Sequence, residues 1–507
     1  MESKVDVRTD PVLQWVREGI IGRTATIPTP NGIKRKRYFD QTASGLPFAP
    51  IEDLIRDKVL PYMANTHTEA SYTGRLMTEL YEEAHQKVHR ALGMHDDDVV
   101  VFTGSGATGA INKLIACMGL RIPDTLRDQF GCADKIHSSA RPLVIRSRME
   151  HHSNDLPWRE TIAITEYVGY DKQGRIDWRE LDEVLSRHKD RPIKIGTFSA
   201  ASNVTGILAN VDELARVMHA HGGYAFFDYA AAAPYVKIDM HPDDDEATRK
   251  DAVFISVHKF TGGPQTPGVL AANRALFRTH APAEPGGGTV LYTSPWEYKY
   301  LEDVQSREEG GTPPIVQVIR AGLVFDVKEK IGTERIEAVE KHFVRRAIEA
   351  WKNDPRIRIL GDLDAPRIGI LSLILDDGQL HHNLAVRLLN DLYGIQTRGG
   401  CMCAGTYGHD LLGIDQARSE EIRCALDGGD VASKPGWVRC SFGPATSEGE
   451  FRVLLDAVPH IAREWRKYAE DYEMDLDTAE WHHPNDPKQL SSISLSMGPT
   501  TQVPTAK

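Results

Sequence analysis

The fold class of this chain is decided by the stretch Arg249-Lys-Asp-Ala-Val-Phe-Ile-Ser-Val-His-Lys-Phe-Thr-Gly-Gly-Pro-Gln-Thr-Pro-Gly268. An apolar run of strand length, Ala252 to Val257, ends in His258-Lys259 and then breaks into Thr-Gly-Gly-Pro. Lys259 is therefore predicted to lie where a buried strand gives way to a loop, a position in which a side chain can meet a ligand. An ordinary solvated lysine at a strand end is the alternative interpretation.

A second apolar run, Gly222-Gly-Tyr-Ala-Phe-Phe-Asp228, ends in a carboxylate 31 positions before Lys259. That spacing leaves room for one strand-crossover-strand unit, so both groups can lie at the carboxyl edge of one parallel sheet. An amine that forms a Schiff base and an acid that keeps a pyridinium nitrogen protonated are what pyridoxal 5'-phosphate (PLP) requires of a protein. Ser256 and His258 flank the lysine as candidate phosphate donors.

A glycine-rich loop, Thr103 to Gly109, stands between the short apolar strand Val99 to Phe102 and the helical pattern Ala110 to Leu120. Backbone N–H groups at such a junction can bind an anion, and the helix dipole adds to the attraction. No Gly-Lys-Ser/Thr follows and the dinucleotide spacing is incomplete, so a plain tight turn is the alternative. Further strands are expected at Pro142 to Arg146 and Ile193 to Phe198, in the alternating order of a parallel α/β sheet.

The second half of the chain reads differently. One long helical pattern runs from Ile315 to Trp351, and strands are expected near Arg367 to Asp376 and Gly394 to Arg398. A final helix is expected from Glu448 to Glu473. From about Trp481 the sequence turns polar and rich in Ser, Thr and Pro, which is typical of a disordered tail.

Composition narrows the classes of function. The net charge of −12 and a pI near 5.9, without a long basic block, argue against nucleic-acid binding and against an anionic membrane surface. Lys34-Arg-Lys-Arg37 is interpreted as a solvated face. No apolar stretch has the length of a membrane span, and the first ten residues lack the apolar core of a signal peptide, so a cytoplasmic protein with a small-molecule substrate is expected.

Six cysteines in 507 residues are too few for a disulfide scaffold and suit a reducing compartment. Cys401-Met-Cys403 is the close pair, and a zinc site there would need two further ligands at matching spacing, which the sequence lacks. We therefore expect no metal site.

Taken together, the motifs from Tyr38 to Ala462 resemble the class V fold-type I PLP enzymes and are most similar to the group II cysteine desulfurases and selenocysteine lyases. The matching segments, in family order, are Tyr38-Phe-Asp-Gln-Thr-Ala, Phe102-Thr-Gly-Ser-Gly-Ala-Thr-Gly-Ala-Ile-Asn112, Glu150-His-His-Ser-Asn-Asp-Leu-Pro-Trp158, Ser202-Asn-Val-Thr-Gly206, Asp228-Tyr-Ala-Ala, Ser256-Val-His-Lys259, Gly311-Thr-Pro313, Arg398-Gly-Gly-Cys-Met-Cys403 and Val438-Arg-Cys-Ser-Phe442.

The resemblance implies an α/β fold of the PLP-transferase type I. Its large domain, residues 38–325, would contain a mainly parallel seven-stranded sheet, and residues 326–475 would form a smaller α+β domain. An N-terminal segment, residues 1–37, would pack on the small domain, and residues 476–507 would be the disordered tail.

The resemblance also implies roles for individual residues. Lys259 would bind the cofactor covalently, Asp228 would pair with its pyridinium nitrogen, and His151 would stack on its ring. The phosphate would be held by Ala107, Thr108, Ser256 and His258, joined by Thr312 from the neighbouring subunit of a homodimer. Asn203 would lie near the cofactor's O3′ and near the substrate.

For the substrate, the resemblance implies that Arg439 grips the carboxylate, because a planar guanidinium pairs with it through two parallel hydrogen bonds. Arg398 and His67 are further expected substrate contacts. Cys403 aligns with the nucleophilic cysteine that takes the sulfur of L-cysteine as a persulfide and leaves L-alanine, with a sulfur-acceptor protein as a possible partner.

Three departures from the family pattern keep other activities open. The family's glutamine three residues after Asp228 is replaced by Ala231, and the Gly-Gly-Cys-Met-Cys motif leaves either Cys401 or Cys403 as sulfur carrier. Arg439 lies 36 positions after Cys403, which indicates an insertion at 404–437. A related class V enzyme acting on another amino acid, such as a cysteine sulfinate desulfinase or C–S lyase, an epimerase or an aminotransferase, is the alternative.

Overall fold

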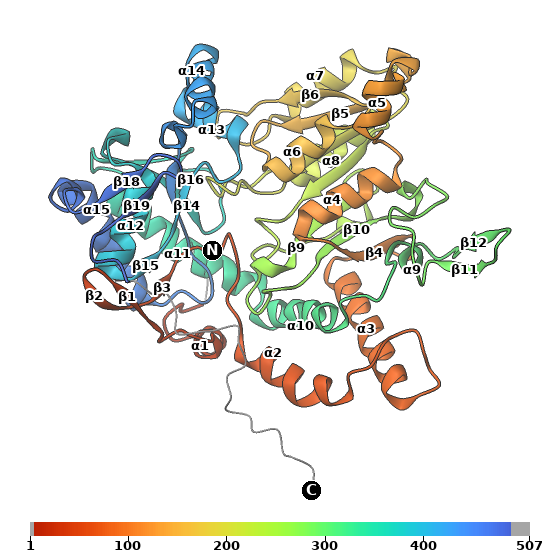
Figure 1. Cartoon of the computed structure of the whole chain (residues 1–507), viewed down its shortest axis with the longest axis horizontal. Helices are drawn as coiled ribbons and strands as arrows, with labels where there is room; N and C mark the ends of the chain where they lie inside the picture. Colours follow the sequence, from red (N-terminus) through yellow and green to blue (C-terminus); the bar gives the residue numbers. More distant parts are fainter. Residues whose placement is uncertain (1–4, 488–507) are drawn as a thin grey trace, which may run out of the picture.

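The computed structural model describes residues 5–487, which form a larger lobe around one sheet and a smaller lobe around another (Figure 1). The larger sheet has seven strands in the order β4-β10-β9-β8-β7-β5-β6. Strand β10 runs antiparallel to both of its neighbours and the other pairs run parallel, so the predicted mainly parallel sheet is confirmed. The strands are β4 (Asp98–Thr103), β5 (Leu143–Ser147), β6 (Ile164–Val168), β7 (Lys194–Ser199), β8 (Tyr224–Asp228), β9 (Ala252–Ser256) and β10 (Gly268–Asn273).

Helices cover both faces of this sheet because its strands are apolar on both sides. Successive residues of a strand point to opposite faces, so Phe226 packs with the cluster around α4 (Gly106–Cys117) and Phe227 with the main core. The main core includes residues of α3 (Tyr72–Ala91), α7 (Trp178–Arg187), α8 (Val211–Ala220) and α10 (Ile315–Ile331). With both faces buried, the strand ends are the places left for ligands.

The smaller lobe has a four-stranded antiparallel sheet in the order β13-β14-β17-β16. Its strands are β13 (Ile357–Ile359), β14 (Ile370–Leu375), β16 (Arg398–Gly400) and β17 (Trp437–Ser441), and its main helices are α11 (Thr333–Trp351), α12 (His382–Tyr393) and α15 (Glu448–Ala469). The prediction of one long helix over 315–351 is wrong at one residue. Gly332 has φ +81°, which ends α10 and starts α11.

The N-terminal segment contacts the smaller lobe. It contains α1 (Pro11–Gly19), β1 (Thr26–Thr29), β2 (Gly32–Arg35) and β3 (Arg37–Tyr38), and β3 pairs in parallel with β15 (Ile395–Gln396). The Thr29 hydroxyl donates a hydrogen bond to the carbonyl of Asp391. This pairing brings the residues that follow β3 to the edge of the smaller sheet.

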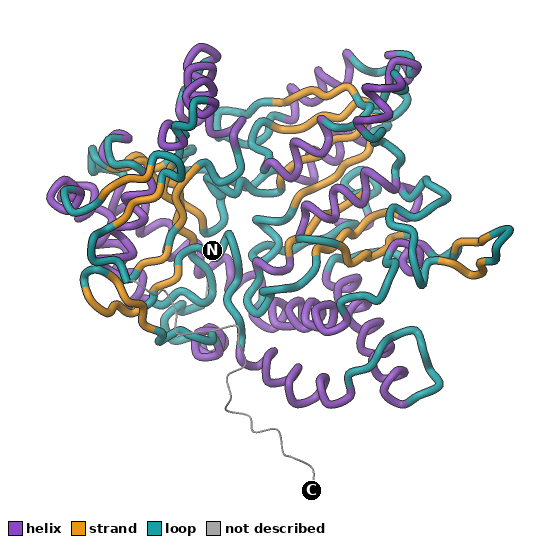
Figure 2. Tube along the Cα trace, in the orientation of Figure 1, coloured by secondary structure: helices purple, strands orange, loops and turns teal. Residues whose placement is uncertain are grey.

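The insertion at 404–437 folds into α13 (Gly405–Leu412) and α14 (Gln416–Asp427), which stand at the top of Figure 1. The tube in Figure 2 shows the hairpin of β11 (Val290–Thr293) and β12 (Tyr298–Tyr300) projecting from the large lobe. Among the described residues, no helix combines the length and the apolar character needed to cross a membrane.

Part of the segment predicted to be a disordered tail is folded. Strand β18 (Glu473–Asp475) pairs with β19 (Glu480–His482), because Trp481 anchors the turn by donating its indole N–H to the His381 ring. Residues 476–487 are therefore part of the fold, and the rest of the predicted tail, 488–507, lies outside the described residues.

Candidate active site

A cavity of about 260 Å³ lies at the carboxyl ends of β8 and β9 and is closed by residues of the smaller lobe. It gathers most of the residues predicted from the sequence. The predicted residues that line it are Ala107, Thr108, His151, Asn203, Asp228, Ser256, His258, Lys259, Arg398, Cys403 and Arg439. Seven segments that are widely separated in the sequence thus meet at one cavity.

Two predicted residues lie elsewhere in the subunit. His67 is exposed in a left-handed turn with φ +64° and contacts Thr66, and Thr312 is exposed after Gly311. Neither lines the cavity. A role for Thr312 in a neighbouring subunit stays a prediction, and a substrate role for His67 within this cavity has no support from its position.

Lys259 and Asp228 face this cavity from adjacent parallel strands. The pKa of Lys259 is lowered to about 8, mainly by burial; Asp228 raises it, and the charges of Arg439 and Arg398 lower it. Burial also raises the pKa of Asp228, whose Oδ1 accepts one hydrogen bond from the backbone N–H of Ala230. A lysine with this pKa has a substantial unprotonated fraction near neutrality, and the buried carboxylate favours a cation placed beside it.

The glycine-rich loop forms a cup at the start of α4. The backbone N–H of Ala107 donates to Ser256 Oγ at 2.9 Å, which ties the loop to the end of β9. Gly106 has φ +59°, and a Cβ there would lie 2.6 Å from Ser256 Oγ and 2.8 Å from His258 Cε1, so the close approach requires glycine. Burial and the nearby Lys259 lower the pKa of His258 to about 4, so its ring is neutral.

His151 caps α6 (His152–Arg159), where its Nδ1 accepts the backbone N–H of Ser153 at 3.1 Å. Burial, with the charge of Lys259, lowers the pKa of His151 to about 3. A flat neutral imidazole therefore faces the cavity, which suits stacking on an aromatic ring.

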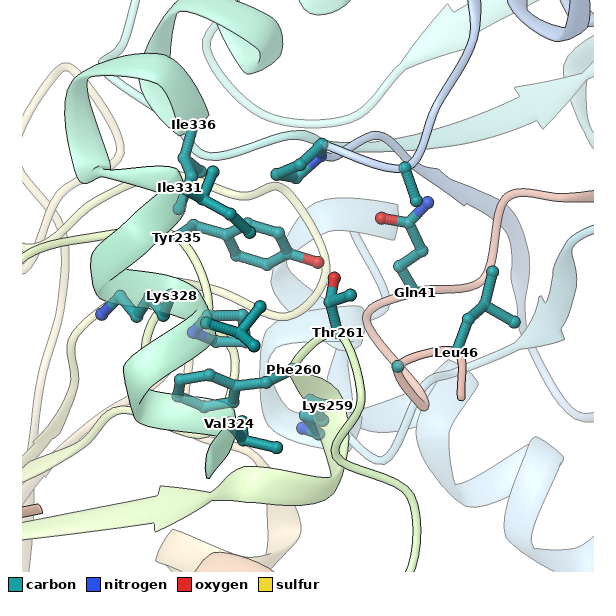
Figure 3. A pocket seen from close by; sticks show the side chains of 15 residues that line it. Gln41, Leu46, Tyr235, Lys259, Phe260, Thr261, Val324, Lys328, Ile331 and Ile336 are labelled. Carbon is teal, nitrogen blue, oxygen red and sulfur yellow. The ribbon is translucent and has the colours of Figure 1, made fainter. Parts of the chain in front are cut away.

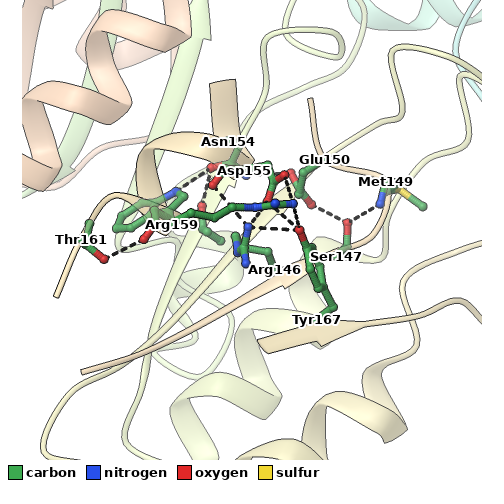
Figure 4. A network of polar contacts seen from close by, with 11 residues as sticks. Arg146, Ser147, Met149, Glu150, Asn154, Asp155, Arg159, Thr161 and Tyr167 are labelled. Atoms are coloured by element: carbon green, nitrogen blue, oxygen red, sulfur yellow. Dashed lines mark hydrogen bonds and ion pairs between the residues drawn. The ribbon is translucent and has the colours of Figure 1, made fainter. Parts of the chain in front are cut away.

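A buried polar network fixes the loop that carries His151 (Figure 4). The carboxylate of Glu150 accepts hydrogen bonds from Ser147, Ser199 and Asn154, while burial raises the pKa of Glu150 to about 7. Asn154 in turn accepts the indole N–H of Trp158. These contacts join β5, α6 and β7, so the loop position is set by the sheet.

Asp40 is a site residue that the sequence analysis did not single out. Its Oδ1 accepts from Arg439 Nη2 at 3.0 Å and its Oδ2 from Arg398 Nε at 2.9 Å, so one carboxylate orients both guanidinium groups. Arg439 Nη1 donates to the carbonyl of Asn203, whereas its Nε is buried and has no hydrogen-bond partner among residues 5–487. The signal was the motif Tyr38-Phe-Asp, which places Asp40 two residues after the end of β3.

The cysteine loop is held by residues of the large lobe. Met402 and Cys403 have φ +55°, and the Met402 carbonyl accepts from Asn203 Nδ2 at 2.8 Å. The Cys403 carbonyl accepts the backbone N–H of His152 at 2.7 Å, and His152 Nε2 accepts the N–H of Gly405 at 3.0 Å. Cys403 is exposed and lines the cavity, whereas Cys401 is only partly exposed and does not line it.

A much smaller cavity lies on the far side of Lys259 (Figure 3). Its volume is about 20 Å³, which holds about one water molecule. Tyr235, Val324 and Lys328 line it, and Lys259 is shared by both cavities. A substrate or cofactor fits only the larger one.

Comparisons with known proteins identify the family of this chain. The aminotransferase class-V family matches residues 37–454. A probable cysteine desulfurase from Halalkalibacterium halodurans is 31% identical over 72% of this chain and 84% of its own length, and a cysteine desulfurase from Haloferax volcanii is 28% identical over 74% and 82%. The chain belongs to the class-V aminotransferase family.

Solved structures show the same fold. A cysteine desulfurase from Thermococcus onnurineus has a TM-score of 0.70 at 24% identity, covering 90% of this chain and 99% of its own. A cysteine desulfurase from Escherichia coli has a TM-score of 0.67 at 21% identity, covering 89% and 98%.

Pyridoxal phosphate is the cofactor of this family and of this class-V enzyme. The site fits it. The cup at α4 offers N–H groups and hydroxyls to a phosphate, His151 offers a flat neutral face, and the buried Asp228 and Lys259 offer an acid and an amine.

Proposed function

We propose that this protein is a cysteine desulfurase that converts L-cysteine to L-alanine and takes the sulfur on Cys403. The observation that carries the proposal is that a thiol and the Lys259 amine line one cavity together with a buried arginine. Both the predicted motif and the curated relatives support this activity.

Different residues of the chain would bind the substrate and transfer its protons. Arg439, with a buried Nε free of protein partners in residues 5–487, and Arg398 would bind the substrate carboxylate, both oriented by Asp40. Lys259 would remove the proton from the substrate's α-carbon and deliver one to the β-carbon. Bound PLP would stabilise the negative charge that develops at the α-carbon.

Cys403 would take the sulfur. Its thiolate attacks the substrate's sulfur, the bond between that sulfur and the β-carbon breaks, and a new sulfur–sulfur bond leaves a persulfide on the enzyme. The electron pair of the broken bond goes to the substrate carbon skeleton, which is released as alanine after protonation. An acceptor thiol must then remove the persulfide sulfur, so we also propose a sulfur-acceptor protein.

A related C–S lyase or desulfinase is the second candidate. Two features favour it: alanine at position 231, where the resembling family has glutamine, and the insertion carrying α13 and α14 beside the cysteine loop. Cysteine sulfinate can lose its sulfur group without a cysteine nucleophile, which gives a direct way to separate the two activities. An epimerase or aminotransferase would form no sulfide or sulfite at all.

The test compares Cys403→Ser with Cys401→Ser as a matched control two residues away. Alanine is assayed with sulfide and sulfite from cysteine and from cysteine sulfinate. We expect Cys403→Ser to lose cysteine turnover but keep cofactor binding and most sulfinate turnover, and Cys401→Ser to keep both. Full cysteine activity in Cys403→Ser with loss in Cys401→Ser would move the sulfur carrier to Cys401, and activity in both would reject a persulfide mechanism.

We further propose a cytoplasmic homodimer with the expected N-terminal segment (1–37) and large domain (38–325), and with a small domain that extends past 475 to include β19. All six cysteines are free, as suits a reducing compartment. The hairpin of β11 and β12 exposes Leu291, Tyr292, Trp296 and Tyr298, an apolar surface that a second copy can cover. Thr312 lies close behind this hairpin in the sequence and would reach the neighbour's phosphate cup. A sedimentation mass of one chain in fully active enzyme would reject the dimer.

A further inference from the structure

A second large cavity lies between the N-terminal segment and the start of α15, and its volume is about 600 Å³. It shares no lining residue with the active-site cavity. Five of the residues that line it are arginines: Arg8, Arg17, Arg23, Arg35 and Arg37. The chain as a whole has a net charge of −12, so this local concentration of positive side chains is opposite in sign to the protein's net charge.

Three carboxylates, those of Glu18, Glu448 and Glu450, also line the cavity, and each already accepts a hydrogen bond from the protein; Gln14 donates to Glu18 at 2.7 Å. Glu448 accepts hydrogen bonds from Arg346 and His342, and these bonds, Arg346 first, lower the pKa of Glu448 to about 2. Glu450 closes the helix cap with Ser447. The other oxygen of Glu450 lies 3.8 Å from Arg35 Nη2. Within residues 5–487, none of the other four arginines forms an ion pair with a carboxylate of the cavity wall.

The arginines are crowded and partly desolvated. Arg17 is 7% exposed and donates its Nε to the carbonyl of Thr446. Burial, and then the charge of Arg23, lower the pKa of Arg17, just as burial and Arg35 lower that of Arg37. Arg23 Nε is buried and has no hydrogen-bond partner in the described part of the chain. An anion in the cavity would relieve this repulsion and supply the missing acceptor.

The start of α15 adds to the attraction. This helix has 22 residues, and its first turn lies on the cavity wall at Glu448 and Gly449. A Cβ at Gly449 would meet no atom within 4 Å, so the backbone there is open to a ligand. Free N–H groups and the helix dipole at such an end favour phosphate.

We propose that this cavity binds a small phosphate-bearing anion. Guanidinium groups match the oxygens of phosphate in paired hydrogen bonds, and several of them converging on a concave site of this size suit a compact ligand with two or more negative charges. Lys34-Arg-Lys-Arg37, expected to be a solvated face, therefore supplies two residues of a binding site. The inference does not depend on the activity proposed above.

The test is calorimetric titration of the holoenzyme with pyrophosphate, in which bound cofactor already fills the phosphate cup at α4. One site per chain is expected. The double variant Arg23→Gln/Arg35→Gln should weaken binding by about tenfold or more, because each lost charge-assisted hydrogen bond contributes a large part of a tenfold factor. The matched control is Arg463→Gln, since Arg463 lies on the same α15, is exposed and pairs with Glu464 outside the cavity.

Three outcomes would overturn the proposal: no pyrophosphate binding at about 1 mM, equal binding in the double variant, or equal weakening in the Arg463→Gln control. Vesicles with anionic lipid headgroups form a further arm, and binding to vesicles without binding to free pyrophosphate would assign the arginines to a membrane surface instead. Cofactor absorbance and circular dichroism check folding, and the single variant Arg35→Gln, at a half-exposed position, serves if the double variant does not fold.

Discussion

Two lysines with low pKa values lie on either side of the small cavity behind the active site, and their surroundings differ. Burial lowers the pKa of Lys259 to about 8 and that of Lys328 to about 7. Lys259 comes from the end of β9 and faces Asp228 and two arginines, whereas Lys328 lies on α10, and its ammonium donates to the carbonyl of Val236 and lies near the ring of Phe260. A depressed pKa alone therefore does not mark a catalytic lysine; a charged, ligand-sized cavity beside it does.

The largest expected effect separates the two lysines directly. Lys259→Ala should abolish covalent attachment of the cofactor and lower turnover by about 10³-fold or more, because the amine is both the attachment point and the proposed base. Lys328→Met should keep both. Borohydride reduction followed by peptide mapping measures the attachment, and cofactor found on Lys328 would invert the comparison.

The carboxylate of Asp228 is the main difference between the surroundings of Lys259 and those of Lys328. Asp228→Asn removes the carboxylate that raises the pKa of Lys259, so this pKa should fall below about 8. In the wild type the unprotonated fraction of the Lys259 amine increases as the pH rises towards about 8. In the variant the same fraction should be reached at a lower pH. We expect turnover to fall by about 10²-fold or more, since the acid opposite the pyridinium is lost.

The rate at which cofactor-free enzyme takes up PLP, measured against pH, reports this shift. Asp362→Asn is a control at a carboxylate in a loop of the smaller lobe, outside the cavity. An unchanged pH profile in Asp228→Asn would mean that burial alone sets the pKa of Lys259.

Asp40 gives the next smaller effect. Asp40→Asn leaves Arg439 and Arg398 without their shared carboxylate, so their orientation towards a substrate is lost and kcat/KM should fall by about 10- to 100-fold, mainly through KM. Cofactor attachment should persist because Lys259 and Asp228 are untouched. A fall in kcat with unchanged KM would contradict a positioning role for Asp40.

The large lobe was more predictable from sequence than the contacts between the lobes. Lys259, Asp228 and the glycine loop each follow a strand of the same parallel sheet, so their meeting follows from topology. Asp40 was missed because its partners Arg398 and Arg439 are about 360 and 400 positions away, and no local pattern shows such a pairing. The predicted tail failed for a similar reason: Trp481 is anchored by His381, a contact that composition cannot show.

Substitution of Lys328 should have the smallest effect, and it should be a gain in stability rather than a loss of activity. A lysine with a folded-state pKa of about 7 and an ordinary value of 10.5 binds fewer protons when folded, so its charge destabilises the fold fully below pH 7 and not at all above about 10.5. Lys328→Met keeps the length of the side chain, loses one hydrogen bond to Val236 and removes this cost. Because the side chain is partly exposed, the gain at pH 7 should be about 1–2 kcal/mol rather than the full value of the shift.

Denaturant unfolding at pH 7 and pH 10 should show this gain in stability shrinking as the pH rises. The control is Lys330→Met, at an exposed lysine on the same helix that pairs with Asp326, and it should show no such trend. A loss of stability at pH 7 would mean that the hydrogen bond from Lys328 to Val236 outweighs the cost of burying its charge.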